Sequence, residues 1–287
     1  MKRVLIILLT LITTLNYAQD LSAFKIFNSQ GQALSYNKMI KELLQADFIF
    51  FGELHNNPIS HWLELEVSKS LYQHTSKLIL GAEMFEADVQ LILDEFLADQ
   101  IREKDVKKEA RVWNNYSTDY KPLLMFAKEN KLNFIATNIP RRYANLVYRK
   151  GFEALNNLSP LAKKYIAPLP IEYDPEIKCY KNMLKGMVHM GMPANPNIAK
   201  AQAIKDATMA YFISKNYKHN YKFIHFNGAY HSDDFLGIIW YLQKLQPNAK
   251  IMTITTVEQE NIDKLQEEYI NKANFIIVVP SNMTKTY

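Results

Sequence analysis

The sequence predicts an α/β fold built on a mostly parallel β-sheet that is flanked by helices. Several short apolar runs are continuous rather than alternating, which is typical of strands that are buried on both faces of a parallel sheet. Patterns with helical spacing separate these runs along the chain. Regular alternation of strand and helix indicates α/β architecture.

The expected strands are short and mostly apolar. They cover residues 48–51, 78–80, 133–136, 222–226, 250–254 and 275–279. The clearest helical patterns cover residues 88–103, 120–131 and 199–215. A crossover between parallel strands needs only about a dozen residues. The much longer, proline-rich stretch before the fourth strand therefore predicts a helical excursion, at about residues 141–216.

The composition is that of a globular protein, with 48% hydrophobic and 22% charged residues among 287. We expect a single α/β domain over residues 19–287. The formal net charge is +5 and falls by two if Lys2 and Arg3 are removed. Such a mild charge, without a basic cluster interleaved with aromatic residues, argues against a nucleic-acid partner. The single cysteine, Cys179, excludes an internal disulfide and is expected to pack as a small apolar residue.

The first 18 residues have the pattern of a secretory signal peptide. Lys2 and Arg3 precede an apolar run, residues 4–15, and a small residue, Ala18, follows it. The run is too short to span a bilayer. No cysteine follows Ala18, so we see no site for lipid attachment. The sequence predicts an exported protein, periplasmic or secreted, whose mature part is soluble.

Polar and ionisable residues follow four of the expected strands. In a parallel α/β sheet the carboxyl ends of the strands face one crevice, where ligands bind. Residues that are distant in sequence are therefore expected to meet there. The candidate crevice residues are Gly52, Glu53, His55, Glu83, Asn138, Arg141, Gly228 and His231.

Two of these strand ends share the form Gly-x-x-His, at Gly52 to His55 and at Gly228 to His231. Together with Glu53 and Glu83, the two imidazoles form a set that is suited to a divalent metal ion. The same four side chains also suit general acid–base catalysis. Both interpretations stay open.

Four of the remaining five histidines have no partner that is defined by spacing. They are His61, His74, His219 and His225. We expect none of them to belong to the direct site, and His225, inside a strand, to be a satisfied core residue.

Five short motifs occur in order along the chain. They are Gly52-Glu53-Leu54-His55, Glu83-Met84-Phe85, Thr137-Asn138-Ile139-Pro140-Arg141, Lys205-Asp206-Ala207-Thr208-Met209-Ala210 and Gly228-Ala229-Tyr230-His231. From about residue 24 to residue 280 the chain resembles the ChaN family of the Tiki superfamily, described as haem-binding, iron-regulated proteins. It also resembles the related erythromycin esterases in its paired Gly-x-x-His turns.

The resemblance implies a parallel sheet with flanking helices and two competing functions. The ChaN branch implies haem binding in iron acquisition, with a haem-linked homodimer, a tyrosine on the iron and an outer-membrane haem receptor as a partner. The Tiki and esterase branches imply hydrolysis in the crevice, protease-like or esterase-like, with a divalent metal in the Tiki case. None of the 17 tyrosines is selected by a local motif.

Haem requires an apolar slot, an axial ligand and polar or basic groups for its propionates. The excursion carries several suitable side chains close together, among them methionines at helical spacing. The alternative is that these methionines pack the helices onto the sheet. The predicted haem contacts are Tyr180, Met187, His189 and Arg141.

We expect the mature protein to begin at or near Gln19, because the signal pattern ends at Ala18. N-terminal sequencing of the protein from its native host measures this directly. A chain that retains Met1 would contradict the assignment.

Overall fold

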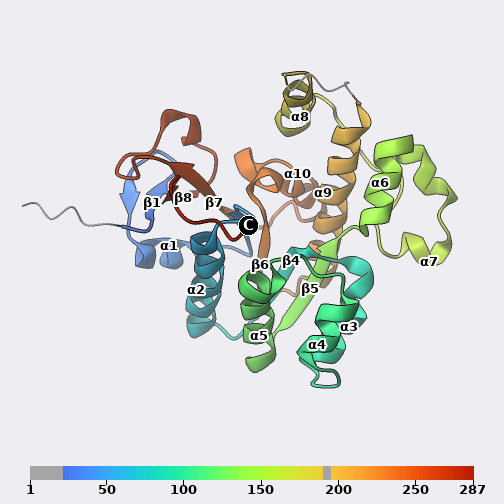
Figure 1. The fold of residues 1–287 in the computed structure, drawn as a ribbon, viewed down its shortest axis with the longest axis horizontal. Coiled ribbons are helices and arrows are strands. Elements are labelled where there is room, and N and C mark those ends of the chain that lie inside the picture. Colours follow the sequence, from blue (N-terminus) through green and yellow to red (C-terminus); the bar gives the residue numbers. More distant parts are fainter. Residues whose placement is uncertain (1–21, 190–194) are drawn as a thin grey trace, which may run out of the picture.

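The computed structural model describes residues 22–189 and 195–287, apart from the side chains of residues 187–189. In this part of the chain, one eight-stranded sheet lies between two layers of helices (Figure 1). The segment expected to be a signal peptide and the methionines at 190 and 192 lie outside the described residues.

The strand order in the sheet is β2-β1-β8-β7-β3-β6-β4-β5. The bounds are β1 Lys25–Asn28, β2 Ala33–Leu34, β3 Phe48–Glu53, β4 Leu78–Glu86, β5 Asn133–Asn138, β6 Lys222–Gly228, β7 Ile251–Gln259 and β8 Phe275–Pro280. Strands β3 to β8 run parallel, which confirms the mostly parallel sheet. The short strands β1 and β2 add an antiparallel edge that the sequence analysis missed.

One face of the sheet is covered by helices from the first half of the chain. They are α1 (Tyr36–Leu43), α2 (Pro58–His74), α3 (Gln90–Leu97), α4 (Glu103–Glu109) and α5 (Lys121–Glu129). Their apolar sides pack with Ile49, Phe51 and Leu80 into the largest core cluster. The helix expected over residues 88–103 is wrong in extent. It ends at Leu97 because Asp99 takes a left-handed backbone conformation with φ of 62°.

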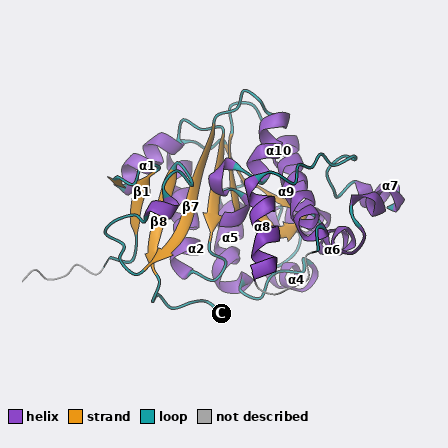
Figure 2. Ribbon diagram, turned by 90° about the horizontal axis from the view of Figure 1, so that it is seen from above, coloured by secondary structure: helices purple, strands orange, loops and turns teal. Residues whose placement is uncertain are grey.

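The opposite face is covered by the long excursion that follows β5 and by α10. This part contains α6 (Arg141–Lys150), α7 (Pro160–Lys163), α8 (Lys178–His189), α9 (Asn197–Asn216) and, after β6, α10 (Ile238–Leu245). Helix α9 packs with Phe48, Phe50 and Phe223 in a second core. The excursion extends beyond one side of the sheet, with α7 farthest out (Figures 1 and 2).

Short helical turns connect several of these elements. They are η1 (Ala87–Val89), η2 (Tyr116–Tyr120), η3 (Phe152–Asn157), η4 (Ala229–His231), η5 (Asp233–Phe235) and η6 (Glu267–Tyr269). Turn η2 has π-helical spacing and leads directly into α5. Within the described ranges, we find no helix with the length and apolar character to cross a membrane.

The feature that positions the site is the pairing of β3 with β6. Glu53 lies opposite Gly228 in this parallel register, so the two Gly-x-x-His turns leave the sheet side by side. A Cβ atom on Gly52 would lie 2.9 Å from the Cα of Ala229, and one on Gly228 would lie 2.6 Å from Nε2 of His55. Each turn therefore needs a residue without a side chain in order to pack against the other.

Candidate functional site

A cavity of about 960 Å³ opens at the carboxyl edge of the sheet. The structure brings most of the candidate crevice residues into its wall, namely Glu53, His55, Glu83, Asn138, Arg141, Gly228 and His231. Gly52 lies just beneath it, packed on Ala229 and Ser232. The adjacent strands β3, β6, β4 and β5 and the turns that follow them carry these residues to one edge, as expected for parallel strands.

His55 is held by a buried carboxylate. Its Nδ1 lies 2.6 Å from Oε1 of Glu53, which also accepts a hydrogen bond of 2.8 Å from the hydroxyl of Tyr120. The ring of Trp113 contacts the imidazole edge-on, at 4.9 Å between centroids. The side chain of His55 is 37% exposed, whereas that of Glu53 is fully buried. Nε2 of His55 is thus the nitrogen that is left to face the cavity.

The charges of this pair are set by opposing effects. Burial alone would raise the pKa of Glu53, but the hydrogen bond from His55 and the proximity of His61 lower it well below its usual range. Burial alone would lower the pKa of His55, but the neighbouring Glu53 and Glu83 raise it. Glu53 is therefore a carboxylate that orients His55 and stabilises its protonated form.

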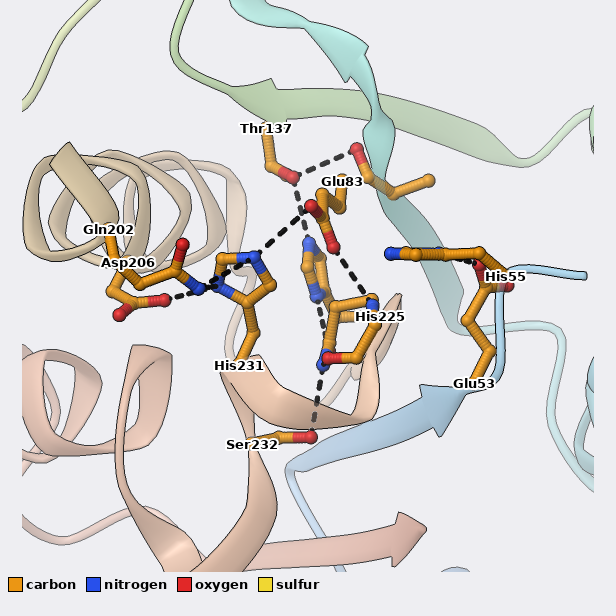
Figure 3. A network of polar contacts seen from close by, with 12 residues as sticks. Glu53, His55, Glu83, Thr137, Gln202, Asp206, His225, His231 and Ser232 are labelled. Atoms are coloured by element: carbon orange, nitrogen blue, oxygen red, sulfur yellow. Dashed lines mark hydrogen bonds and ion pairs between the residues drawn. The ribbon is translucent and has the colours of Figure 1, made fainter. Parts of the chain in front are cut away.

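His231 lies between two buried carboxylates, one from β4 and one from α9 (Figure 3). Its Nε2 is 3.1 Å from Oε1 of Glu83, and its Nδ1 is 2.5 Å from Oδ1 of Asp206. The backbone N–H of Gly228 donates to Oε2 of Glu83 at 2.8 Å, and the hydroxyl of Tyr180 donates to Oδ2 of Asp206 at 2.8 Å. Both ring nitrogens of His231 are therefore engaged.

Burial alone would lower the pKa of His231, but Glu83 and Asp206 raise it to about 10. Burial alone would raise the pKa of Glu83, but the charge of His231 lowers it to about 2. At Asp206, the effect of burial is larger than the opposing effect of His231, so the pKa of that carboxyl group is raised. At neutral pH, His231 is an imidazolium ion that holds Glu83 ionised at the floor of the cavity.

His61 was not expected to belong to the direct site, and it is not among the cavity-lining residues, but it contacts the site from behind. The first turns of α2 place His61 directly beneath Glu53, with 3.2 Å between Nδ1 and Oε2. The second carboxylate of this cluster is Glu64, one helical turn farther along. The spacing His61-x-x-Glu64, which places both residues on one face of a helix, was the sequence signal for this cluster. Only the packing of α2 against β3 reveals that both residues face Glu53.

The other three histidines lie where the sequence analysis expected them. His225 is buried in β6, within hydrogen-bonding distance of Thr137 at 2.8 Å and of Asn227 at 3.1 Å. Burial lowers its pKa to about 4, so it is a neutral core residue. His74 and His219 are exposed.

The predicted haem contacts from the excursion are separated by the fold. Arg141 lines the cavity at the start of α6. Tyr180 is 1% exposed, with its hydroxyl bound to Asp206, and is not among the cavity-lining residues. The side chains of Met187 and His189 lie outside the described residues. Helix α9 instead adds Gln202, Lys205 and Asp206 to the site, which the sequence analysis did not assign to it.

The fold and site together define a class of protein: a parallel α/β sheet with a Glu/His pocket at its carboxyl edge. A family model described as "Haem-binding uptake, Tiki superfamily, ChaN" matches residues 39–242. The chain belongs to this family. The predicted family and fold class are therefore confirmed.

A solved structure illustrates the similarity of fold. A structure of ChaN of Campylobacter jejuni, titled as showing cofacial haem binding, is 19% identical and superposes with a TM-score of 0.64. The match covers 90% of this chain and 97% of that one. The erythromycin esterase EreC, in its open conformation, is 10% identical with a TM-score of 0.48, over 90% of this chain and 83% of that one.

A curated relative is similar over part of its length. Protein RETICULATA-RELATED 5, chloroplastic, of Arabidopsis thaliana is 24% identical over 186 residues, or 60% of this chain. The aligned region spans 25% of that relative.

We expect the stability that the Glu83–His231 pair contributes to peak between about pH 4.5 and 6.5. The contribution of Glu83 is complete above its ordinary pKa of 4.5 and is lost as the pH falls through about 2. That of His231 is complete below its ordinary pKa of 6.5 and is lost as the pH rises through about 10. Removing one partner of a buried pair costs about 3–5 kcal/mol. Urea unfolding of wild type and Glu83→Gln from pH 4 to pH 10 measures the difference in their free energies of unfolding.

The control for this measurement is Glu66→Gln, which removes a partly exposed pair with Lys69. Such a surface pair contributes about 0–1 kcal/mol. A Glu83→Gln difference that stays flat from pH 4 to pH 10 would show that the pair does not act as described.

Proposed function

We propose that this protein binds haem in the cavity at the carboxyl edge of the sheet. The observation that carries the proposal is that the cavity is lined both by apolar side chains and by several cations. The volume of about 960 Å³ lies at the upper end of the usual range for ligand pockets, about 300–1,000 Å³. The description of the family to which the chain belongs supports the same ligand.

The cavity wall has the chemistry that haem requires. Its apolar members are Leu54, Val112, Trp113, Ile139, Ala144, Met183 and Ala229. Arg111, Arg141 and Lys205 supply positive charge for the two propionates. Arg111 also pairs with Glu86 at 2.8 Å, so Arg141 and Lys205 are the better candidates.

We assign the axial position to His55. Its Nδ1 is held by Glu53, the arrangement in which a carboxylate fixes the ring and makes the other nitrogen a stronger ligand. Tyr230 and Tyr287 also line the cavity, so a phenolate is the competing ligand. Tyr180 is not retained as a ligand because its hydroxyl is bound to Asp206.

The setting that we propose is outside the cytoplasm, in haem and iron acquisition. The signal pattern over residues 1–18 and the family description of haem-binding uptake support it. In that setting an outer-membrane haem receptor is the expected partner. A haem-linked homodimer would place the open mouths of two cavities face to face.

We expect purified protein to bind haemin and to change its absorption spectrum. His55→Ala removes the proposed axial ligand and should alter both the Soret band and the affinity. Arg141→Gln should weaken binding about 10-fold without changing the spectrum, because it removes only a charge. Arg149→Gln, at the exposed far end of α6, is the matched control.

A His55→Ala protein with the wild-type spectrum would contradict the axial assignment. If Tyr230→Phe or Tyr287→Phe changes the spectrum instead, the ligand is that tyrosine. Wild-type protein that binds haemin no better than the Arg141→Gln and His55→Ala double variant would contradict haem binding in this cavity.

A second function, hydrolysis, is favoured by the contrast between the two histidines. His55 has a buried carboxylate on Nδ1 and its other nitrogen toward the cavity, as a general base requires. It would take a proton from water as the water oxygen attacks the carbonyl carbon of an ester, and it would return that proton to the leaving alcohol when the acyl C–O bond breaks. A divalent ion bound in the crevice would polarise that carbonyl. Of the four predicted metal ligands, His231 has both nitrogens engaged and Nε2 of His55 is needed as the base. Oε1 of Glu53 is engaged by His55 and Tyr120, which leaves the carboxylate of Glu83 as the better candidate.

We expect His55→Ala to lower any esterase activity by about 100-fold or more, since general base catalysis contributes about 10²–10⁴-fold. Hydrolysis of p-nitrophenyl acetate, measured beside metal analysis, tests this. Glu83→Gln and His231→Ala should also lose activity, whereas His74→Ala should not. Wild-type activity equal to that of His55→Ala would eliminate the hydrolase.

A further inference from the structure

We propose that Glu53, His61 and Glu64 form a buried site for a divalent transition-metal ion, with Zn²⁺ as the best match. This site lies behind the cavity, on the α2 side of Glu53. It differs from the set of crevice residues that the sequence suggested for a metal. It does not depend on whether the cavity takes haem or a hydrolysable substrate.

The three residues offer ligand atoms at suitable separations. One ligand atom from each lies within 4.8 Å of the other two. Nδ1 of His61 is 3.2 Å from Oε2 of Glu53 and 3.5 Å from Oε2 of Glu64. A tetrahedral ion bound at about 2.0–2.2 Å holds its ligands about 3.3–3.6 Å apart. The two separations from Nδ1 of His61 are therefore close to those of ligands around an ion.

The same spacing is poor for direct hydrogen bonds. A charged N–H donor lies about 2.7–2.9 Å from a carboxylate oxygen. Among the described residues, Oε2 of Glu53, Nδ1 of His61 and both oxygens of Glu64 have no hydrogen-bond partner. These side chains are 1%, 5% and 0% exposed. Polar atoms that are buried in this way are costly unless something binds them.

The contacts of Nε2 of His61 determine whether Nδ1 carries a hydrogen or a lone pair. Nε2 of His61 is 3.1 Å from the carbonyl oxygen of His55 and 3.3 Å from Oδ2 of Asp119. Both are acceptors, so Nε2 carries a hydrogen and Nδ1 directs its lone pair toward the two glutamates. Histidine ligands of metal ions commonly donate their second N–H to a carboxylate or a carbonyl oxygen in this way.

A lone pair that faces two carboxylates needs a positive charge between them. The alternative to a metal is protons, with Nδ1 of His61 and one oxygen of Glu64 protonated. Burial and the charge of Glu53 do raise the pKa of Glu64, and Glu53 and Glu64 raise that of His61 to about 11 against its burial. The lengths of 3.2 and 3.5 Å and the missing hydrogen bonds favour the ion.

The ligand set indicates the kind of ion. One imidazole nitrogen with carboxylate oxygens matches Zn²⁺ better than Mg²⁺ or Ca²⁺, which prefer oxygen alone. Glu64 has two unpartnered oxygens, so it can fill two positions and close the coordination sphere. A closed, buried sphere indicates a structural ion.

Such an ion would act on the cavity through Glu53. One carboxylate oxygen would bind the ion, while the other holds Nδ1 of His55 at 2.6 Å. Glu53, His61 and Glu64 are therefore positioning residues for His55.

The experiment measures Zn²⁺ content and affinity in full-length purified protein. We expect about one Zn²⁺ per chain, and a rise in the Tm of chelator-treated protein when Zn²⁺ is added. Glu64→Gln should lower the affinity by at least about 10- to 100-fold. Glu66→Gln on the same helix and His231→Ala in the cavity should bind Zn²⁺ as the wild type does.

A protonated Glu64 is mimicked by glutamine, so the proton alternative predicts that Glu64→Gln matches the wild type with or without Zn²⁺. That result overturns the proposal. A wild type whose Tm does not respond to Zn²⁺ also overturns it, and this measurement does not require any variant to fold. If His231→Ala loses the ion while Glu64→Gln keeps it, the ion lies in the cavity and the proposed site is wrong.

Discussion

The arrangement of the site depends on the buried carboxylate of Glu53 at the end of β3. Its Oε1 atom accepts hydrogen bonds from Tyr120 and His55, and its Oε2 atom faces His61. Residues from the loop after β3, from helix α2 and from turn η2 thus all contact the side chain of Glu53. A buried anion is stable only when cations or donors surround it, so this carboxylate constrains what can lie on every side of it.

That constraint depends in turn on the pairing of two strands. Because β3 lies next to β6, the turns that follow them pack against each other, and glycine at 52 and 228 lets them approach. His55 packs against Gly228. His231 projects from the adjoining turn toward Glu83 and Asp206 (Figure 3). The two turns have the same Gly-x-x-His sequence, yet their histidines have different roles. One is clamped at both nitrogens as a fixed cation, and the other keeps one nitrogen toward the cavity.

The chain belongs to a family described by haem uptake, and its cavity has both the apolar wall and the cations that haem needs. The same cavity has a polar floor of ionised residues. Fold alone does not decide between binding and hydrolysis. Both proposed functions use Nε2 of His55, so the spectrum with haemin and the hydrolysis assay have to be measured on the same variant to separate them.

The sequence by itself determined the six parallel strands, the helices between them and the edge at which the ionisable residues gather. Continuous apolar runs and strand-end glycines are local signals, since burial on both faces and tight turns restrict residue type wherever they occur. Only the tertiary structure decided that β6 lies between β3 and β4, and that α9 brings Asp206 to His231. It also decided that His61 and Glu64 face Glu53, and that Tyr180 is sealed beneath the cavity. The order of strands and the rotation of a helix about its axis result from packing between segments that are distant in sequence. The neighbours of a side chain across such a contact therefore cannot be read from the residues next to it in the sequence.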